Sequence, residues 1–346
     1  MDKPRKNGSV RIALIILCVV LATILVVMAG LAFYVNYLYN KMEYVDQHTT
    51  LSPEEASSVA IQDAETIAPE DDDWVNQDDI EFNDDYVYEE GQGDHIINIM
   101  LVGQDAREGE SVQRSDTMML VTFNLKTRTI TLTSLMRDQY VKIPGHGSTK
   151  LNHAYQYGGM DLMNETLKNH FGIEVDGNFE VDFTGFEKII DLLGGVEIDL
   201  TQKEVDYLKE KGFKNVKKGK NILEGESALW YARLRSIDND YQRAERQRNV
   251  MMSLFESYKE LSYAQMLSLL HEILPLVRTN MTMSEITNYA LKLYPMLSGA
   301  EVETLRIPVD GTFKGGFVKV SEGLKLWCQY NIDFEANRKI LEEVFE

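Results

Sequence analysis

The stretch Ile96-Ile97-Asn98-Ile99-Met100-Leu101-Val102 is a short, nearly continuous apolar run, and Gly103-Gln104-Asp105-Ala106-Arg107 follows it directly. A run of this length and composition is typical of a buried strand. Polar residues placed just after such a strand lie at a sheet edge or in a loop. The stretch therefore predicts a buried sheet with a candidate site at the end of its first strand.

Further strands and helices are predicted on the C-terminal side of this run. Strand-like patterns occur at residues 118–123, 129–134, 140–143, 196–200, 302–307 and 316–320. Helical patterns occur at residues 162–171, 186–193, 228–231, 241–258, 263–274 and 283–297. Strands mixed with helices in this way indicate an α/β (α+β) sandwich, in which helices cover a central mixed β-sheet.

Charge is distributed unevenly along the 346 residues, whose net charge is −20. Residues 1–41 carry a net charge of +4, residues 42–94 hold eighteen acidic residues and no Lys or Arg, and residues 95–346 carry −6. An acidic balance disfavours sequence-independent binding to nucleic acid. The only two cysteines, Cys18 and Cys328, exclude a disulfide scaffold and a Cys-rich zinc module.

The N-terminal third is predicted to anchor the chain in a membrane. Residues 12–35 contain no Asp, Glu, Lys, Arg or His, and as a helix they would extend about 36 Å, enough to cross a bilayer. The run is too long for a cleaved signal peptide. Because the basic residues precede it, residues 1–11 are expected to be a cytoplasmic basic tail. Residues 36–94 are expected to be an acidic extracytoplasmic linker or stalk, and residues 95–346 the folded domain outside the membrane.

Arginine and aspartate recur in short motifs of this folded domain. Seven of its twelve arginines fall in the five segments Gly103–Arg107, Arg114–Thr117, Arg137–Asp138, Arg233–Arg235 and Asp240–Gln247. In the last segment a helix is expected to carry Asp240, Arg243, Arg246 and Gln247 on one face. Arginine binds phosphate bidentately and stays charged, and Mg²⁺ commonly binds one or two carboxylates together with substrate phosphates. The motifs favour a site for a polyanion and a divalent cation, with surface ion pairing as the alternative.

Taken in order, and with the Lys-x-Asn-x-Ala-Tyr motif of residues 150–155 among them, these motifs resemble those of the LytR-CpsA-Psr family. The resemblance covers residues 95–255. It implies an extracytoplasmic phosphotransferase of the Gram-positive cell envelope. Such an enzyme would move an anionic glycopolymer, of the wall teichoic acid or capsular polysaccharide type, from an undecaprenyl pyrophosphate carrier to peptidoglycan.

The resemblance also implies roles for single residues. Asp105 and Asp116 would hold Mg²⁺ or Mn²⁺ and, with Arg114 and Arg137, form the catalytic set. The expected contacts of the substrate pyrophosphate are Arg107, Arg114, Arg137, Lys150, Arg233, Arg235, Arg243, Arg246 and Gln247. The lipid would occupy an apolar tunnel between helices and sheet. No nucleotide cofactor is expected, because the phosphoanhydride of the carrier supplies the driving force and the chain has no Walker loop.

Two other functions fit the same sequence. A membrane-anchored sensor or regulator would bind the lipid-linked pyrophosphate without turning it over. A single-pass glycosyltransferase would use Asp238-Asn239-Asp240 as a metal-binding motif. Transfer of a glycan with release of the prenyl phosphate distinguishes the predicted enzyme from the sensor.

Overall fold

The computed structural model describes residues 37, 43–45, 50–52, 54–56, 58, 64–66, 73–82, 92–105, 114–259 and 261–346. The predicted membrane span and cytoplasmic tail lie outside these residues. No helix in the described part of the chain is long and apolar enough to cross a membrane.

The described residues form a mixed α/β fold whose elements are as follows. The strands are β1 (Glu43–Tyr44), β2 (Glu65–Thr66), β3 (Val75–Asn76), β4 (Ile96–Asp105), β5 (Arg114–Asn124), β6 (Thr129–Leu135), β7 (Tyr140–Ile143), β8 (Gly147–Lys150), β9 (Gly177–Asp182), β10 (Val196–Leu200), β11 (Gly219–Leu223), β12 (Arg278–Thr279), β13 (Glu301–Ile307), β14 (Lys314–Ser321) and β15 (Leu324–Tyr330). The helices are α3 (Leu151–Phe171), α4 (Phe183–Leu192), α5 (Gln202–Glu210), α6 (Gly225–Arg233), α7 (Asp240–Tyr258), α8 (Tyr263–Ile273), α9 (Met283–Leu297) and α10 (Phe334–Phe345), with short 3₁₀ turns at Gln77–Asp79 and Leu274–Leu276.

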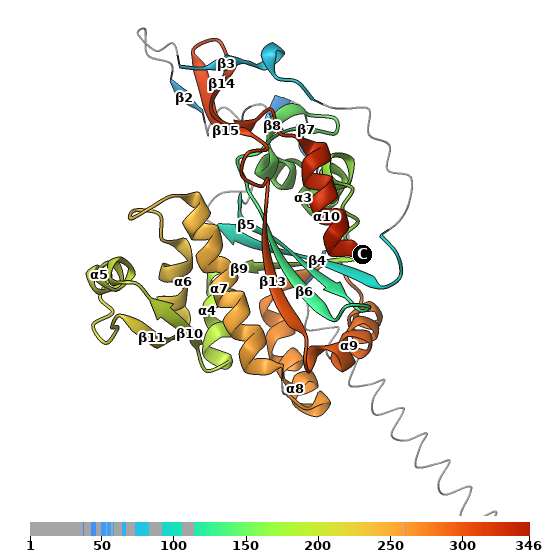
Figure 1. The fold of residues 1–346 in the computed structure, drawn as a ribbon, viewed down its shortest axis with the longest axis vertical. Helices are drawn as coiled ribbons and strands as arrows, with labels where there is room; N and C mark the ends of the chain where they lie inside the picture. The colour runs from blue at the N-terminus through green and yellow to red at the C-terminus, as the bar shows by residue number, and fades with distance from the viewer. Residues whose placement is uncertain are drawn as a thin grey trace, which may run out of the picture.

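The central sheet has the strand order β1-β12-β9-β4-β5-β6-β13. β4 pairs antiparallel with β5 and parallel with β9, and β13 pairs parallel with β6, so the sheet is mixed. Figure 1 shows this sheet crossing the middle of the molecule. The predicted central mixed β-sheet is confirmed.

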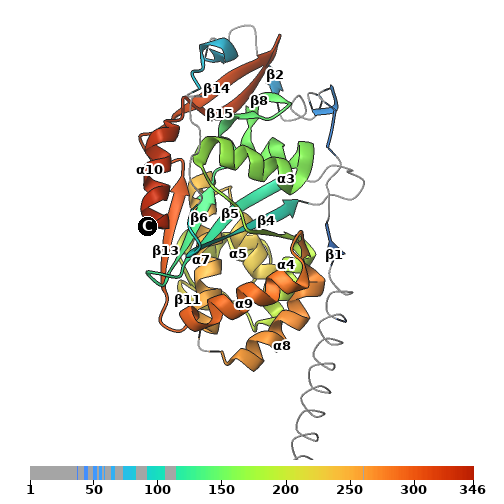
Figure 2. The ribbon, with the colours of Figure 1, turned by 90° about the vertical axis from the view of Figure 1, so that its right-hand side faces the viewer.

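Helices cover both faces of this sheet, which explains why β4 is apolar along most of its length. Met100 and Val102 of β4 belong to one apolar cluster, which also contains residues of α3 and α10. Ile97 and Ile99, which alternate with them, belong to a second cluster that includes residues of α8 and α9. Figure 2 shows α3 and α10 on one side of the strands and α8 and α9 on the other.

Part of the predicted stalk packs against the domain. β1 pairs with β12, β2 with β15 and β3 with β14, while Ala56 and Ile80 are buried. The described parts of residues 36–94 therefore differ from the expected extended stalk. The acidic composition left too few apolar residues for a core of its own, but these few residues share the apolar clusters of the domain.

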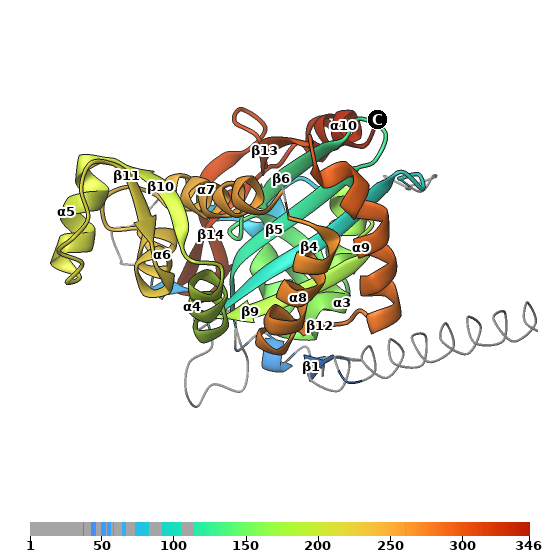
Figure 3. The ribbon, with the colours of Figure 1, turned by 90° about the horizontal axis from the view of Figure 1, so that it is seen from below.

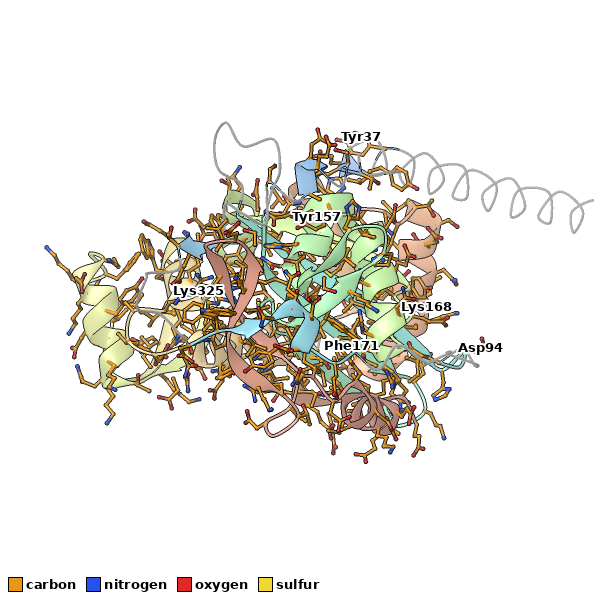
Figure 4. All side chains as sticks on the ribbon, turned by 90° about the horizontal axis from the view of Figure 1, so that it is seen from above. Tyr37, Asp94, Tyr157, Lys168, Phe171 and Lys325 are labelled. Carbon is orange, nitrogen blue, oxygen red and sulfur yellow. The ribbon has the colours of Figure 1, made fainter. Side chains whose placement is uncertain are left out.

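A small four-stranded sheet, with the order β2-β15-β14-β3, lies at one end of the molecule beside the β7–β8 hairpin. In Figure 4, which is seen from above, Lys325 marks β15, and Tyr157 and Phe171 mark the two halves of α3. The backbone N–H of Gln329 in β15 donates a hydrogen bond of 2.8 Å to the carbonyl of Asp138. The small sheet thus helps to fix the turn that follows β6.

Candidate functional site

The turn between β6 and β7 holds Arg137 and Asp138. The carbonyl of Arg137 accepts a hydrogen bond from the backbone N–H of Asn152 at 3.2 Å, at the start of α3. The carbonyl of Asp138 accepts one from β15, as described above. Because α3 and the small sheet hold this turn from two sides, the Arg137 guanidinium is positioned at the end of β6 by backbone contacts.

The first residue of α7 places a carboxylate opposite this arginine. Asn239 caps α7, since its side-chain oxygen accepts the backbone N–H groups of Tyr241 at 2.9 Å and Gln242 at 3.4 Å. Asp240 follows at the N-terminus of the helix, where the helix dipole favours negative charge.

Three arginines surround Asp240, and we refer to Arg137, Arg235 and Arg243 as the arginine cluster. The nearest nitrogen–oxygen distances to the Asp240 carboxylate are 3.3 Å from Arg137, 3.5 Å from Arg235 and 3.3 Å from Arg243. Among the described residues, the buried Nε and Nη1 of Arg243 have no hydrogen-bond partner, although Nη1 is in the ion pair with Asp240. One carboxylate facing three guanidinium groups leaves an excess of positive charge, which suits a polyanion.

A second carboxylate, Asp138, connects this cluster to Lys150. Lys150 Nζ lies 2.8 Å from Asp138 Oδ1, and Arg137 Nε lies 3.4 Å from Asp138 Oδ2. Burial by itself raises the pKa of Asp138, but the charges of Arg137 and Lys150 outweigh it and hold that pKa below its ordinary value. Burial raises the pKa of Asp240 despite the neighbouring arginines, and the nearby Asp138 carboxylate adds to this rise. The pKa values of the two carboxyl groups are therefore shifted in opposite directions.

An apolar pocket of about 130 Å³ lies between the central sheet and helices α4, α6 and α7. Its lining is almost entirely apolar and includes Leu101, Met119, Phe186, Leu229, Ala232, Val250 and Met251. The polar exceptions include Arg233 and Gln247. Figure 3 shows α4 and α7 lying against the sheet beside β4 and β5. These residues line an apolar space between helices and sheet.

Arg233 and Arg235 separate at the end of α6. The Arg233 guanidinium carbon lies 4.0 Å from the centre of the Phe183 ring, beside the apolar pocket, while Arg235 extends to Asp240. Gln247 donates a hydrogen bond of 3.5 Å to the carbonyl of Ala232. Two groups of predicted pyrophosphate contacts result: Arg233 and Gln247 line the apolar pocket, and Arg137, Arg235 and Arg243 form the arginine cluster.

A second, polar pocket of about 460 Å³ lies on the other side of Asp240. Its lining residues are Met136, Arg137, Asp138, Lys150, Asn239, Asp240, Tyr241, Trp327 and Gln329. Arg137 thus belongs to both the arginine cluster and this polar pocket, and Asp240, the shared ion-pair partner of the cluster, lines the pocket as well. Lys150, predicted as an additional cationic contact, also lies here.

The strand ends that carry Asp105 and Asp116 meet across the β4–β5 pair. Asp105 pairs with Arg114, and the register then skips Asp116, because Gln104 pairs with Ser115 and Gly103 with Thr117. This bulge places the backbones of the two aspartates close together on neighbouring strands. The side chains of Asp105, Arg114 and Asp116, and the whole of Arg107, lie outside the described residues.

Residues of the Lys-x-Asn-x-Ala-Tyr motif support these two strand ends. The buried Gln104, next to Asp105, donates hydrogen bonds to the Tyr155 hydroxyl and to Glu180, the latter at 2.5 Å. Ser115, next to Asp116, donates to the carbonyl of Asn152 at 3.5 Å. The motif therefore acts on the predicted metal site through the residues beside the two aspartates.

Arg246 lies apart from the arginine cluster, which corrects the expected helix face. It is 4% exposed and forms an ion pair of 2.7 Å with Glu204, a second with Asp238, and a hydrogen bond of 2.9 Å to the carbonyl of Leu234. At 100° per residue, a spacing of six turns a side chain about 120° away from Asp240, whereas spacings of three and seven stay near it. Arg246 therefore binds α7 to α5 and to the loop after α6.

The Asp238-Asn239-Asp240 triplet does not form a metal-binding motif in this arrangement. Asp238 pairs with Arg246, Asn239 caps α7 and Asp240 faces the arginine cluster. The described residues contain no group of three or more His, Cys, Asp or Glu side chains that could hold a metal ion.

Comparison with known proteins identifies the family. The model of the LytR_cpsA_psr family matches residues 49–332. The chain belongs to the LytR-CpsA-Psr family. The match begins well before residue 95, in agreement with the pairing of β2 and β3 and the burial of Ala56 and Ile80 in the domain.

Two curated relatives from this family have different names. The polyisoprenyl-teichoic acid–peptidoglycan teichoic acid transferase TagT of Bacillus subtilis (strain 168) is 36% identical over 223 residues, covering 62% of this chain and 68% of TagT. The regulatory protein MsrR of Staphylococcus aureus (strain COL) is 32% identical over 256 residues, covering 73% of this chain and 76% of MsrR.

Solved structures of LytR-CpsA-Psr proteins share the fold. TagT bound to LIIa-WTA has a TM-score of 0.58 and 30% identity, covering 74% of this chain and 92% of that one. YwtF (TagT) with bound octaprenyl pyrophosphate lipid has a TM-score of 0.54 and 28% identity, covering 74% and 91%. This family fold therefore includes proteins solved with a polyisoprenyl pyrophosphate.

The sequence did not predict that the polar pocket would be lined by Asp138, Asp240, Tyr241 and Trp327. Asp138 and Asp240 stand inside recognised motifs, so their position in the motifs was a signal. Tyr241 and Trp327 had none, because Trp327 reaches the polar pocket only through the pairing of β15 with the rest of the small sheet.

Proposed function

We propose that this protein transfers an anionic cell-wall glycopolymer from a polyisoprenyl pyrophosphate carrier to peptidoglycan. The observation that carries the proposal is the order of features along α7. Gln247, Val250 and Met251 line the apolar pocket, Arg243 lies in the arginine cluster and Asp240 borders the polar pocket. The rise from Asp240 to Gln247 is about 10 Å. A substrate in which an apolar chain, a pyrophosphate and a polar group are joined in that order matches the apolar pocket, the arginine cluster and the polar pocket.

The arginine cluster supplies the electrostatic part of the reaction. The substrate phosphates compete with Asp240 for Arg137, Arg235 and Arg243, and the Nε and Nη1 atoms of Arg243, which have no hydrogen bond among the described residues, gain acceptors. An acceptor hydroxyl oxygen forms a bond to the phosphorus next to the glycan, and the bond from that phosphorus to the oxygen bridging the two phosphates breaks. The products are a phosphodiester to the acceptor and a prenyl monophosphate, and the hydroxyl proton leaves to a base or to water. Guanidinium groups stabilise the charge that develops on the leaving phosphate.

The proposed reaction uses a divalent cation. Two aspartates on adjacent strands, brought close by the bulge at Asp116, offer the carboxylate oxygens that Mg²⁺ or Mn²⁺ prefers. Asp105 and Asp116 would hold the ion, and a bound ion would supply positive charge to the phosphates.

The proposed location is the outer side of a Gram-positive cell membrane. Residues 12–35 would anchor the chain with residues 1–11 in the cytoplasm, and the domain would face the wall. Both proposed substrates are found there, because peptidoglycan and the lipid carrier meet at that surface.

The test is a transfer assay with the full-length chain in detergent. The donor is a polyprenyl-pyrophosphate-linked disaccharide, the acceptor is uncrosslinked peptidoglycan, and Mg²⁺ is present. We expect glycan-modified peptidoglycan and an equal amount of prenyl monophosphate, both detected by mass spectrometry and both lost with EDTA. Binding of the donor without either product contradicts the proposal.

A sensor that binds the lipid-linked precursor remains the second candidate, since one relative is named a regulatory protein. It uses the same arginine cluster and apolar pocket. Donor binding that survives in the absence of turnover, measured in the same assay, is its distinguishing result.

A further inference from the structure

The polar pocket beside the arginine cluster contains an exposed tryptophan. Trp327 is 40% exposed, whereas its neighbours Leu326 and Cys328 on the other face of β15 are buried. An ideal Cβ on Gly315 would lie 3.2 Å from the Trp327 ring, so the absence of a side chain at Gly315 gives the indole room over β14. The indole therefore lies over a glycine, with much of its surface accessible to a ligand.

Polar groups of several kinds surround this ring. Gln329, two residues along the same face of β15, is 1% exposed and its Nε2 donates to the Tyr241 hydroxyl at 3.1 Å. Its Oε1 has no hydrogen-bond partner among the described residues. Asp138 and Lys150 complete the wall. A buried amide oxygen without a partner is costly unless a ligand or water satisfies it.

We propose that the polar pocket binds a sugar ring next to the reacting phosphorus, with Trp327 as the surface on which the ring stacks. A pyranose ring presents C–H groups on its faces and hydroxyl groups at its edge. The indole fits the face, because the negative face of the ring system attracts polarised C–H groups. The Gln329 oxygen and the Asp138 carboxylate accept from hydroxyl groups, and Lys150 donates to them.

The position of the pocket gives this sugar a role in transfer. The inference rests on the proposed function, since the arginine cluster then holds the pyrophosphate. Arg137 belongs to the arginine cluster, Asp240 is its ion-pair partner, and both line the polar pocket, so a ring in this pocket lies next to phosphates held by the cluster. Two rings have that position, the first sugar of the donor and the acceptor sugar of peptidoglycan.

Steady-state transfer by full-length Trp327→Ala separates these two sources. The donor is the polyprenyl-pyrophosphate-linked disaccharide and the acceptor is uncrosslinked peptidoglycan. We expect KM to rise about fivefold to tenfold for one substrate only, with partial recovery in Trp327→Phe. A rise for peptidoglycan assigns the acceptor ring, and a rise for the donor assigns the donor ring. The matched control is Trp74→Ala, which removes a tryptophan just before β3 of the same small sheet, outside the pocket.

Because Trp327 packs over Gly315, a second variant is included in case Trp327→Ala does not fold. Gln329→Leu then carries the test, because it removes the partnerless oxygen while keeping the size of the side chain. We expect it to raise the same KM with the melting temperature nearly unchanged. Unchanged KM values for both substrates in Gln329→Leu and in folded Trp327 variants overturn the sugar site.

A binding measurement separates this inference from the proposed function. The chain has three tryptophans, so indole fluorescence of the full-length chain can be titrated with a soluble N-acetylglucosamine tetramer. If wild type catalyses no transfer, the proposed function fails, yet a saturable emission change that is absent in Trp327→Phe still supports the sugar site. Active transfer with KM values that do not depend on Trp327 or Gln329 leaves the proposed function intact and rejects the sugar site.

Discussion

Arg243 and Arg246 lie one turn apart on α7 and are buried to nearly the same degree, at 5% and 4% exposure, yet their surroundings differ. Arg246 has two carboxylates and a carbonyl as partners. Arg243 has one ion pair, with a carboxylate that two other arginines also approach, and two nitrogens without a hydrogen bond among the described residues. A satisfied buried arginine stabilises the fold, whereas an under-satisfied one beside a pocket is available to a ligand.

The largest expected effect of this comparison is on stability. Arg246→Ala leaves the largely buried Glu204 carboxylate without its cation and frees Asp238. We expect the free energy of unfolding to fall by about 3–5 kcal/mol, because breaking a buried pair leaves an uncompensated charge. Chemical denaturation of the full-length chain measures this loss.

The matched control is Arg248→Ala on the same helix. Arg248 makes a single hydrogen bond, of 2.8 Å, to the hydroxyl of Ser134, so we expect a loss near 1 kcal/mol. Equal losses in the two variants would show that Arg246 has no special role in the fold.

Arg243→Ala should produce the opposite pattern, with activity lost and stability kept. Removing one positioned donor to a developing phosphate charge is expected to lower transfer about 100- to 1000-fold. The melting temperature should change little, because Asp240 keeps Arg137 and Arg235 and the repulsion among the arginines decreases. Arg243→Lys keeps the charge without the planar fork and should recover only part of the rate. A melting temperature as low as that of Arg246→Ala would remove the distinction between the two arginines.

Periodicity predicted the site-facing side of α7 only in part. Spacings of three and seven correctly brought Asp240, Arg243 and Gln247 together, and the spacing of six misplaced Arg246. The partners of Arg246 on α5 were not foreseeable, because residues 202–210 were not predicted as a helix. The sequence shows that arginines occur close together. Whether each one stabilises the fold or faces the site depends on which carboxylates the tertiary fold brings near it.

The central sheet was easier to predict than its surroundings. β4, β5 and β6 follow from apolar runs that lie close together along the chain, and these patterns are local to the sequence. β15 was missed, and with it the polar pocket, because its strand is defined by pairing with β14 and by short segments from residues 65–76. The packing of those segments also depends on apolar clusters that composition alone does not reveal.

The two carboxyl groups beside Arg137 extend the comparison to pH. The pKa of Asp138 is lowered in the fold, so its contribution to stability is complete above its ordinary value of 3.8 and is lost as pH falls through the folded pKa. The pKa of Asp240 is raised, so its contribution is complete below 3.8 and is lost as pH rises through the folded pKa. Stability–pH profiles of Asp138→Asn and Asp240→Asn should therefore differ from wild type in opposite directions.

At pH 7 we expect Asp138→Asn to lose about 1.5–3 kcal/mol, since Lys150 and Arg137 lose a charged partner. Asp240→Asn should be at least as stable as wild type at that pH, because burial raises the pKa of Asp240 and the neutral amide avoids the cost of burying its charge. Thermal unfolding between pH 3 and pH 8 measures both profiles. Losses of the same sign and size would mean that the two carboxyl groups act as one unit.

The smallest expected effect is on binding of the prenyl chain in the apolar pocket, which α6 and α7 both line. Ala232 is 7% exposed and lies in the lining of the apolar pocket with Val250 and Met251. Ala232→Leu adds three carbons to a cavity of about 130 Å³, so less of a prenyl chain can enter. We expect KM for a long-chain donor to rise about tenfold, which corresponds to roughly 1.4 kcal/mol of lost binding. KM for a donor with a two-isoprene chain should change less, because a short chain loses less apolar contact. Since Ala232 is not among the residues that line the polar pocket with Asp240 and Trp327, KM for peptidoglycan should stay constant. An equal rise for both donors would show that the apolar pocket does not hold the chain.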